Sequence, residues 1–223
     1  MAVNKISEEK EDYLKVLLTQ DGDSRYVSNK LLANQLKVKP PSVTEMMTKL
    51  QKDGLVDYQS YKGYMLTEQG LQHTLGIIKR HRLIESFLIE FLNYSWDQVH
   101  SEAEVLEHKV SSLFIDRIDQ LMGYPAHCPH GGIIPRGDDY QETYQKNLLS
   151  FSEGDFLIIR RADDHPELLS FLDSKHIKIN SKIQLIEHDE STSHLLIRHE
   201  DNDIKVDKNW ASGIYGERYT SVS

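Results

Sequence analysis

Cysteine is almost absent from this chain, which has one, Cys128, among its 223 residues. A lone thiol excludes an intrachain disulfide and favours a reducing compartment. Long apolar runs are missing as well, since none approaches the roughly 20 residues of a membrane-spanning helix. The first fifteen residues are charged and lack the apolar stretch of a secretory signal. We therefore expect a cytoplasmic protein with no membrane partner.

Basic residues are in the minority, with 26 Lys and Arg against 35 Asp and Glu, so the net charge is −9. The acidic excess is unevenly distributed, because residues 1–75 carry 10 basic and 10 acidic side chains and are neutral. From Arg25 to Lys62 there are seven basic residues and three acidic ones. Charges more than about 10 Å apart are screened, so this local excess suits a phosphate-binding face despite the acidic total.

The first third of the chain has the element order of a winged helix-turn-helix. Apolar spacing predicts helices over 7–20 and 42–54, with a short helix between them that opens at Ser28. Two strands within residues 55–67 follow as a hairpin. Helix, helix, turn, helix, hairpin is the order of winged-helix DNA-binding domains. Residues 1–72 are therefore predicted to bind double-stranded DNA.

The third of these helices is the predicted reading helix. Ser42 is its predicted N-cap, and Glu45 completes a capping box. Four residues at helical spacing are predicted to face the core: Val43, Met46, Met47 and Leu50. The predicted DNA contacts are Lys39, Pro40, Pro41, Ser42, Thr44, Glu45 and Lys49, with Lys62 at the tip of the wing. The alternative is a winged helix that binds protein, and the local basic excess favours DNA.

Two long amphipathic helices are predicted next, over 67–93 and 96–122. A segment rich in proline and glycine follows, over 125–143, and is predicted to be irregular. Residues 73–143 are therefore predicted to form a second, helical domain.

From about residue 146 the pattern changes to short β-like runs, with one short helix over Pro166–Ser174. The predicted strands are 156–159, 183–186, 194–197 and 203–206. Residues 144–223 are therefore predicted to form a small β-barrel or sandwich, so that the whole chain has an α+β fold.

Ligand-type side chains cluster on the helix predicted over 96–122. Glu104, Glu107 and His108 stand at i, i+3 and i+4, so they share one helix face. A divalent cation would relieve the repulsion between the two carboxylates. Glutamate-rich helix faces are commonly only solvated, so this pattern alone is a weak indication of a metal site.

Further residues of the same types strengthen the indication. A histidine and a glutamate lie one turn apart on the preceding helix, another histidine precedes Glu104 by one turn, and a Cys-Pro-His run lies in the irregular segment. These residues are His81, Glu85, His100, Cys128 and His130, and Asp12 lies in the first helix. So many ligand types within a short span exceed what chance clustering gives, and they indicate a metal-binding protein.

Five motifs, taken in order, resemble those of the diphtheria toxin repressor family. They are EDYLK (11–15), PPSVTEMMTKLQKDGLV (40–56), GYMLTEQG (63–70), KRHRLIESFL (79–88) and EAEVLEHKVS (102–111). The CPHGG run (128–132) before a C-terminal β-domain resembles the three-domain, manganese-responsive branch of streptococci and related bacteria. The resemblance covers nearly the whole chain, most strongly to about residue 135.

The resemblance implies that residues 73–143 form a dimerisation and metal-binding domain. It also implies that residues 144–223 form an SH3-like β-barrel similar to the domain found with ferrous transport proteins. The implied function is that of a homodimeric repressor, which binds an inverted-repeat operator and controls metal uptake genes when Mn(II) or Fe(II) is present.

The resemblance also implies ligand sets. One site matches Asp12, Glu104, Glu107 and His108. The second site matches His81, Glu85, Cys128 and His130, together with an acidic residue from the third domain. That residue is Asp164 by alignment, and Asp163 is the alternative. His100 matches a ligand of the iron-responsive branch.

Departures from the other branches favour Mn(II). The iron-responsive branch has methionine where this chain has Asp12 and cysteine where it has Glu104, and oxygen ligands suit Mn(II) better. Lys15 replaces a second acid of the two-domain manganese branch, which argues against that branch's two-metal cluster. The thiolate of Cys128 also admits Zn(II) or Fe(II) at its site.

Two other classes of function remain as alternatives: a metal-dependent hydrolase, and a winged helix gated by a small organic ligand. The sequence has no nucleophile with an oriented base and no glycine-rich phosphate loop, so we expect no enzyme activity. DNA binding that depends on metal and is abolished by a chelator separates the repressor from a regulator gated by an organic ligand.

Overall fold

The structure is a computed structural model that describes residues 6–137, 140–188 and 191–219. It divides into two compact units, one of residues 1–80 with 135–140 and one of residues 81–134 with 141–223. Within the described residues, even the longest helix, α4 (Glu68–Leu92), lacks an apolar stretch sufficient for a membrane span.

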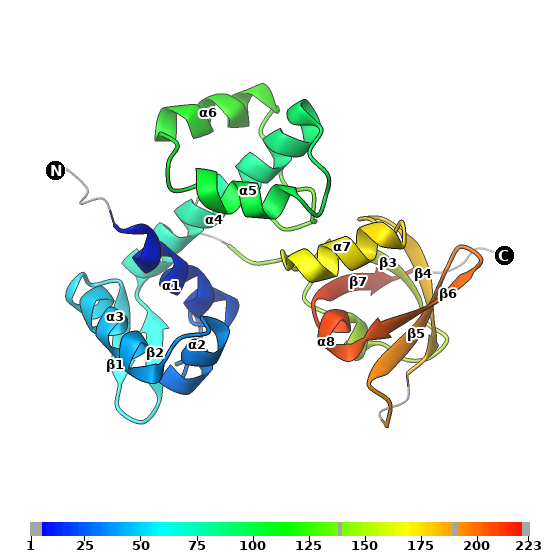
Figure 1. Ribbon diagram of the computed structural model, residues 1–223, viewed down its shortest axis with the longest axis horizontal. Coiled ribbons are helices and arrows are strands. Elements are labelled where there is room, and N and C mark those ends of the chain that lie inside the picture. The colour runs from blue at the N-terminus through cyan, green and yellow to red at the C-terminus, as the bar shows by residue number, and fades with distance from the viewer. Residues whose placement is uncertain (1–5, 138–139, 189–190, 220–223) are drawn as a thin grey trace. The chain divides into compact units, whose positions relative to one another are not determined.

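The first unit is the predicted winged helix (Figure 1). Its elements are α1 (Glu8–Thr19), α2 (Asn29–Gln35), α3 (Pro40–Lys52), β1 (Val56–Gln59), β2 (Gly63–Leu66) and the start of α4. The two strands are antiparallel, with Val56 opposite Leu66. Ser28 caps α2 by accepting a hydrogen bond from the backbone N–H of Leu31. The predicted order of elements is therefore confirmed.

Apolar residues from all these elements form one core. The four α3 residues predicted to face it, Val43, Met46, Met47 and Leu50, are all buried there. Each fully buried side chain of this size contributes about 1.5–3 kcal/mol, so the apolar stripe fixes which face of α3 points outward. The polar residues of α3 are left on the opposite, exposed face.

The prediction for the start of α3 is wrong. The helix begins at Pro40, with Lys39 as N-cap, so Ser42 lies inside the first turn. Proline suits the first helical positions because its φ is already helical and its missing N–H would have no partner there. Glu45 pairs with Lys49, Oε1 to Nζ at 2.8 Å, instead of closing a capping box.

The second unit opens with the remainder of α4, followed by α5 (Val99–Leu106) and α6 (Ser112–Leu121). The single helix predicted over 96–122 is therefore wrong, because the chain breaks between α5 and α6. Ser111 caps the new helix by accepting a hydrogen bond from the backbone N–H of Phe114 at 3.2 Å. The break lets both helices pack on α4 around a shared apolar core that includes Leu83, Ile84, Val99, Ala103 and Ile115.

The C-terminal part is a five-stranded antiparallel sheet of order β6-β5-β4-β3-β7. Its strands are β3 (Phe156–Ala162), β4 (Lys182–Glu187), β5 (His194–His199), β6 (Asn202–Asp207) and β7 (Ile214–Arg218), with a short 3-10 turn, η1 (Leu148–Ser150), before them. The four predicted strands are confirmed, and β7 was not predicted. The strand order leaves β6 and β7 as edges, so the described strands form a small SH3-like sheet rather than a closed barrel.

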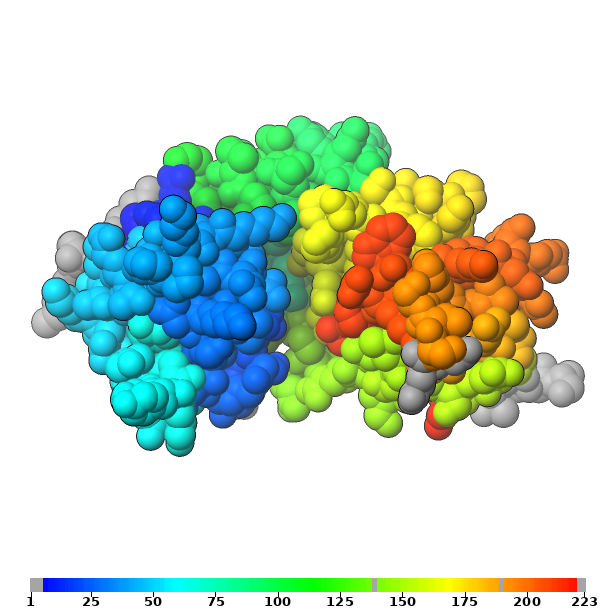
Figure 2. All heavy atoms as spheres, turned by 60° about the horizontal axis from the view of Figure 1, so that its bottom comes forward, coloured from blue at the N-terminus to red at the C-terminus, as the bar shows by residue number. Residues whose placement is uncertain are grey.

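Two helices accompany the sheet, α7 (Pro166–Ser174) and α8 (Lys208–Ala211). The bounds of α7 are those predicted. Both views show α7, in yellow, beside the orange-red α8 (Figures 1 and 2), and the rings of Phe171 and Trp210 pack with centroids 4.6 Å apart. The core beneath them contains residues from every strand.

Candidate metal centres and nucleic-acid interface

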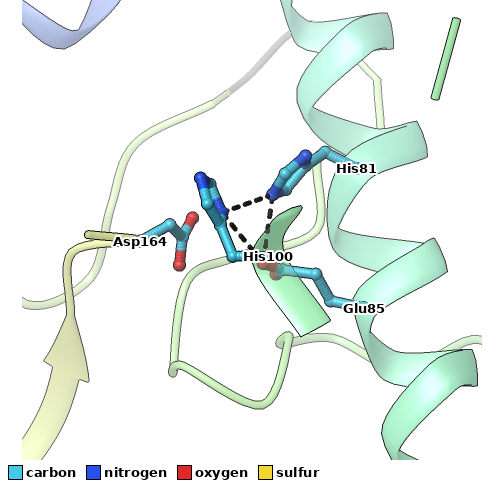
Figure 3. A group of neighbouring side chains, drawn as sticks. All are labelled: His81, Glu85, His100 and Asp164. Atoms are coloured by element: carbon cyan, nitrogen blue, oxygen red, sulfur yellow. Dashed lines mark hydrogen bonds and ion pairs between the residues drawn. The ribbon is translucent and has the colours of Figure 1, made fainter. Parts of the chain in front are cut away.

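One face of α4 carries His81 and Glu85, both buried and one turn apart. Nε2 of His81 lies 3.0 Å from Oε1 of Glu85. His100, from α5, brings its Nδ1 to 3.1 Å from the same Nε2 of His81. With Asp164, which follows β3, these residues offer four ligand atoms within 4.8 Å of one another (Figure 3).

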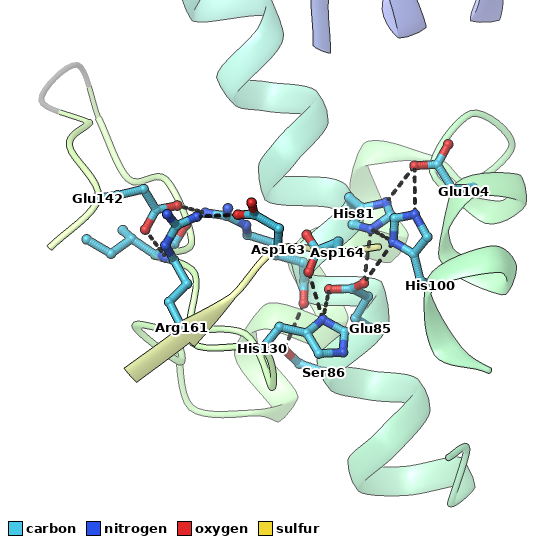
Figure 4. Close-up of polar contacts among 12 residues, drawn as sticks. His81, Glu85, Ser86, His100, Glu104, His130, Glu142, Arg161, Asp163 and Asp164 are labelled. Carbon is cyan, nitrogen blue, oxygen red and sulfur yellow. Dashed lines mark hydrogen bonds and ion pairs between the residues drawn. The ribbon is translucent and has the colours of Figure 1, made fainter. Parts of the chain in front are cut away.

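The loop after α6 brings Cys128 and His130 to the other side of Glu85. Nδ1 of His130 lies 3.4 Å from Oε2 of Glu85 and 2.9 Å from Oδ1 of Asp164 (Figure 4). The backbone N–H of Ala162 donates to the carbonyl of His130 at 2.9 Å, which holds the loop against β3. Gly131 permits this approach, since its φ is +84° and a Cβ there would lie 1.9 Å from the carbonyl oxygen of Arg160.

Four buried polar atoms at this point have no hydrogen-bond partner within the described residues: Oε2 of Glu85, both ring nitrogens of His130 and Oδ1 of Asp164. Buried polar groups are normally satisfied, because an unmade hydrogen bond costs about 1–3 kcal/mol. A group of buried carboxylate and imidazole atoms that make ion pairs with one another but no hydrogen bond, beside a buried thiol, fits a divalent cation as a shared partner.

The charges of the cluster are strongly coupled. Burial opposes ionisation of Glu85, but His81 and His130 outweigh it and hold the pKa of Glu85 well below its usual range. Burial also opposes the charge on His130, but Glu85 and Asp164 outweigh it and raise the pKa of His130 well above its usual value. Before a cation binds, the cluster therefore holds an ion pair whose proton a metal must displace.

A further donor set lies at the end of α5. Nδ1 of His81 is 2.6 Å from Oε2 of Glu107 and 3.7 Å from Oε1 of Glu104. His108 adds Nε2 at 3.4 Å from the other oxygen of Glu107. Asp12, predicted to complete this set, is half-buried on α1 in the first unit, and its membership remains a prediction.

The two acids that competed for the third-domain position lie in different surroundings. Asp164 lies with His130, as described. Asp163 lies 3.0 Å from Nη1 of Arg161 and accepts a hydrogen bond from the Tyr215 hydroxyl at 3.3 Å. Burial raises the pKa of Asp163 to about 6. The geometry therefore favours Asp164 over Asp163 as a ligand.

The predicted DNA contacts are all solvent-accessible. All eight, from Lys39 to Lys62, are exposed. The hydroxyl of Thr44 donates to the carbonyl of Pro40 at 3.1 Å and accepts from the Asn29 amide at 2.7 Å, so it also joins α2 to α3. A shallow depression lined by Asn29, Lys30, Pro40, Pro41 and Thr44 lies beside it.

Known proteins that combine a DNA-binding domain with a metal-binding and dimerisation domain were found by comparison of sequences and of structures. The N-terminal DNA-binding domain of iron-dependent repressors matches residues 5–64, and their metal-binding and dimerisation domain matches residues 67–136. The HTH-type transcriptional regulator MntR of Oceanobacillus iheyensis is 35% identical over 114 residues, 51% of this chain and 77% of that relative.

Solved structures match almost from end to end. The manganese regulator SloR is 37% identical with a TM-score of 0.82, and the match covers 94% of this chain and 98% of that one. ScaR with bound Zn²⁺ is 36% identical with a TM-score of 0.86, over 94% and 99%. The chain belongs to the diphtheria toxin repressor family. The match to these solved structures continues beyond residue 136, so the chain has the three-domain form of that family. It is a metal-dependent transcriptional repressor.

Two side chains around the candidate ligands of this diphtheria toxin repressor family member were not predicted. Arg82, on α4, pairs with Glu142 at 2.8 Å and donates to the carbonyl of Ile133, which closes the loop after Cys128. Trp96 lies between α4 and α5, with its ring centroid 5.1 Å from that of His130. The spacing of residues in the sequence does not indicate either contact, because each partner residue lies more than one helix or strand away along the chain.

Proposed function

We propose that this chain is a Mn(II)-activated homodimeric repressor, which binds an inverted-repeat operator and controls metal uptake genes. The observation that carries the proposal is the pair of donor sets around His81 and Glu85, in which four buried carboxylate and imidazole atoms make no hydrogen bond within the described residues. The solved neighbours include a manganese regulator and a manganese-activated repressor, which supports Mn(II) as the activating ion.

We assign one ion to His81, Glu85, Cys128, His130 and Asp164, and another to Asp12, Glu104, Glu107 and His108. The second set has mostly oxygen donors, which suit Mn(II), a weak binder that must be selected by ligand type and geometry. The thiolate of the first set admits Fe(II) or Zn(II) more readily, and ScaR has been solved with Zn²⁺. We propose that the ions act as effectors rather than as catalysts.

The exposed face of α3 is the proposed reading surface. Its N-terminal turn enters the major groove, where Ser42 offers a hydroxyl and the apolar depression at Pro40 and Pro41 receives a thymine methyl. Lys39 and Lys62 contact phosphates, which position the protein without reading sequence. Lys49 is already paired with Glu45, so it contributes less than its charge suggests.

An apolar surface supports the homodimer. Seven large apolar side chains are exposed on the end of α4, on α5, on α6 and just after it: Phe91, Leu92, Val105, Leu113, Phe114, Leu121 and Tyr124. Soluble proteins rarely leave such a concentration uncovered. Residues 67–136 match a dimerisation domain, so a second copy of the chain is the proposed occupant.

Metal and DNA affinities must then be coupled reciprocally. The predicted membership of Asp12, on α1, in a metal site links the DNA-binding domain to the dimerisation domain. An ion that favours the arrangement required by two half-sites raises DNA affinity, and DNA raises metal affinity by the same factor.

The test is fluorescence anisotropy with a duplex selected by the protein from random DNA in the presence of Mn(II). We expect tight binding with Mn(II), loss of binding with a chelator, and a steep fall with salt because counterions are released. Glu107→Gln should remove the stimulation by Mn(II), whereas the exposed Glu153→Gln should not. Equal DNA affinity with Mn(II) and with chelator would overturn the proposal.

A further inference from the structure

The loop that carries two of the candidate ligands is closed by a short backbone ladder. His127 and Ile133 face each other across it as an antiparallel bridge. Hydrogen bonds lie on either side of this pair, from the N–H of Cys128 at 2.8 Å and from the N–H of Ile134 at 2.9 Å, each to a carbonyl of the opposite side. A residue flanked in this way directs its own N–H and C=O away from the ladder. The N–H and C=O of Ile133 therefore need partners from outside the loop.

Arg82 and Glu142 supply both partners. Nη1 of Arg82 donates to the carbonyl of Ile133, and Oε2 of Glu142 accepts from its N–H at 3.2 Å. The two side chains also pair with each other, with Nη1 of Arg82 2.8 Å from Oε1 of Glu142 (Figure 4). They are only 10% and 15% exposed, so salt and water screen this ion pair weakly. Together they bind Ile133 as a neighbouring strand would, and we call this pair the clasp.

The clasp joins the loop to two other parts of the second unit. Arg82 belongs to α4, whereas Glu142 lies just before the C-terminal domain. Two residues after Glu142, the carbonyl of Tyr144 accepts from Nε of Arg161 on β3 at 3.4 Å, which holds this segment to the sheet. Protein contacts alone therefore fix the loop to α4 and to the C-terminal domain.

Gly132 permits the close approach of the clasp. A Cβ at this position would lie 2.6 Å from Cζ of Arg82, so the guanidinium lies directly against the loop backbone. Cys128 and His130 lie within the loop that this contact closes. Their ligand atoms and that of Glu85 are already within 4.8 Å of one another. A loop that is ordered in advance loses less conformational entropy when an ion binds.

We propose that Arg82 and Glu142 are positioning residues of the cysteine-containing metal site. They hold Cys128 and His130 together before an ion arrives, and neither is assigned as a ligand. The inference rests on the proposed function, because it takes the thiolate and the imidazole of this loop as metal ligands.

The size of the effect follows from the fraction of molecules whose loop is correctly arranged. Groups that orient metal ligands typically contribute tenfold to hundredfold in affinity, and we expect about tenfold here. Apparent affinity is proportional to the fraction of the protein in the binding arrangement. A tenfold loss therefore means that the loop holds this arrangement only about one tenth of the time. Metal affinity and hydrogen-exchange protection of the metal-free loop must then fall together.

The experiment compares the wild-type full chain with Glu142→Gln and Arg82→Met, alone and together. Co(II) titration followed by the near-ultraviolet thiolate band measures metal affinity. Hydrogen exchange of the metal-free protein measures protection of the N–H groups of Cys128 and Gly131, which both bond within the loop. Each single variant should lower Co(II) affinity about tenfold and remove most of this protection, which saturating Co(II) restores. The double variant should be no weaker than either single one, because the two side chains act as one unit.

Glu167→Gln is the matched control, since it makes the same charge change at an exposed residue of α7, and it should alter neither measurement. If a clasp variant does not fold, as judged by circular dichroism, Gly132→Ala takes its place, because the added methyl displaces the guanidinium without removing a charge. Unchanged affinity and protection in folded variants overturn the inference, even if their Tm is lower. Weaker Co(II) binding with full loop protection also overturns it, because the clasp would then act through charge rather than position. Absence of the cobalt–thiolate band in the wild type overturns instead the metal assignment of the proposed function.

Discussion

Among single residues, His130 has the most distinctive environment, because it is fully buried and its Nδ1 faces the carboxylates of both Glu85 and Asp164. Its pKa is raised, so its ion pairs with Glu85 and Asp164 stabilise the metal-free fold below the usual pKa of 6.5. That stabilisation is lost as the pH rises through the raised value. Over the same range the proton stops competing with metal.

We therefore predict opposite pH trends with and without metal. As the pH rises above 6.5, the Tm of the metal-free protein should fall, and the increase in Tm caused by Mn(II) should grow. Differential scanning calorimetry in chelator and in Mn(II) measures both. His130→Gln should flatten both curves, and a metal-induced increase that is constant with pH in the wild type would contradict the prediction.

At the scale of elements, the connection between α4 and α5 joins the helical region to the C-terminal domain. Trp96, in this connection, is 8% exposed and packs in the same core as Leu157 and Leu169 of the C-terminal domain. The contact is apolar and needs no ion, so the C-terminal domain has an anchor besides any metal held through Asp164.

Removal of this anchor has a predictable cost. We expect Trp96→Ala to lower the free energy of unfolding of the C-terminal domain by about 3–5 kcal/mol, because a large buried aromatic side chain leaves a cavity. Urea unfolding followed by the fluorescence of Trp210, the other of the two tryptophans, measures the change. Tyr61→Ala, at an exposed aromatic of the hairpin, should change stability by less than about 0.5 kcal/mol.

Limited proteolysis of the Gly- and Pro-rich segment before the C-terminal domain provides a second test of the Trp96 anchor. With the apolar anchor intact, Cys128→Ser should weaken metal binding but increase limited proteolysis between residues 131 and 146 only modestly. Trp96→Ala should increase it strongly, because the domain on which the connection ends is released. Equal cleavage rates for Trp96→Ala and the wild type would show that Trp96 does not anchor the domain.

At the scale of the whole molecule, the proposed repressor acts as two copies of the chain. Leu113 is 64% exposed on α6, within the proposed dimer face, so Leu113→Glu should place a charge in the interface. We expect a monomer by sedimentation velocity, unchanged Mn(II) stoichiometry, and an operator affinity reduced by ~100-fold because two half-sites no longer act together. Lys175→Glu, a charge reversal on the C-terminal domain, should leave the dimer intact. A dimeric Leu113→Glu protein with full operator affinity would place the interface elsewhere.

Local patterns in the sequence were sufficient to predict much of the fold and the types of side chain that serve as candidate metal ligands. The core positions of α3, the bounds of α7 and four strands follow from apolar periodicity, which depends on residues one to four apart. The match of the C-terminal domain to solved relatives also agrees with the resemblance. The candidate ligands were named because a few carboxylates, imidazoles and one thiol recur at helical spacing or in one short loop.

Tertiary structure alone decided how those residues combine. Asp163 and Asp164 are neighbours in sequence, and only the path of the chain after β3 turns one toward Arg161 and the other toward His130. The break after α5 depends on packing against α4, which a continuous amphipathic pattern cannot reveal. The two-sided position of His81 joins residues 4 and 26 positions away. Spacing along a helix predicts which side chains share a face, whereas burial of a common core determines which faces meet.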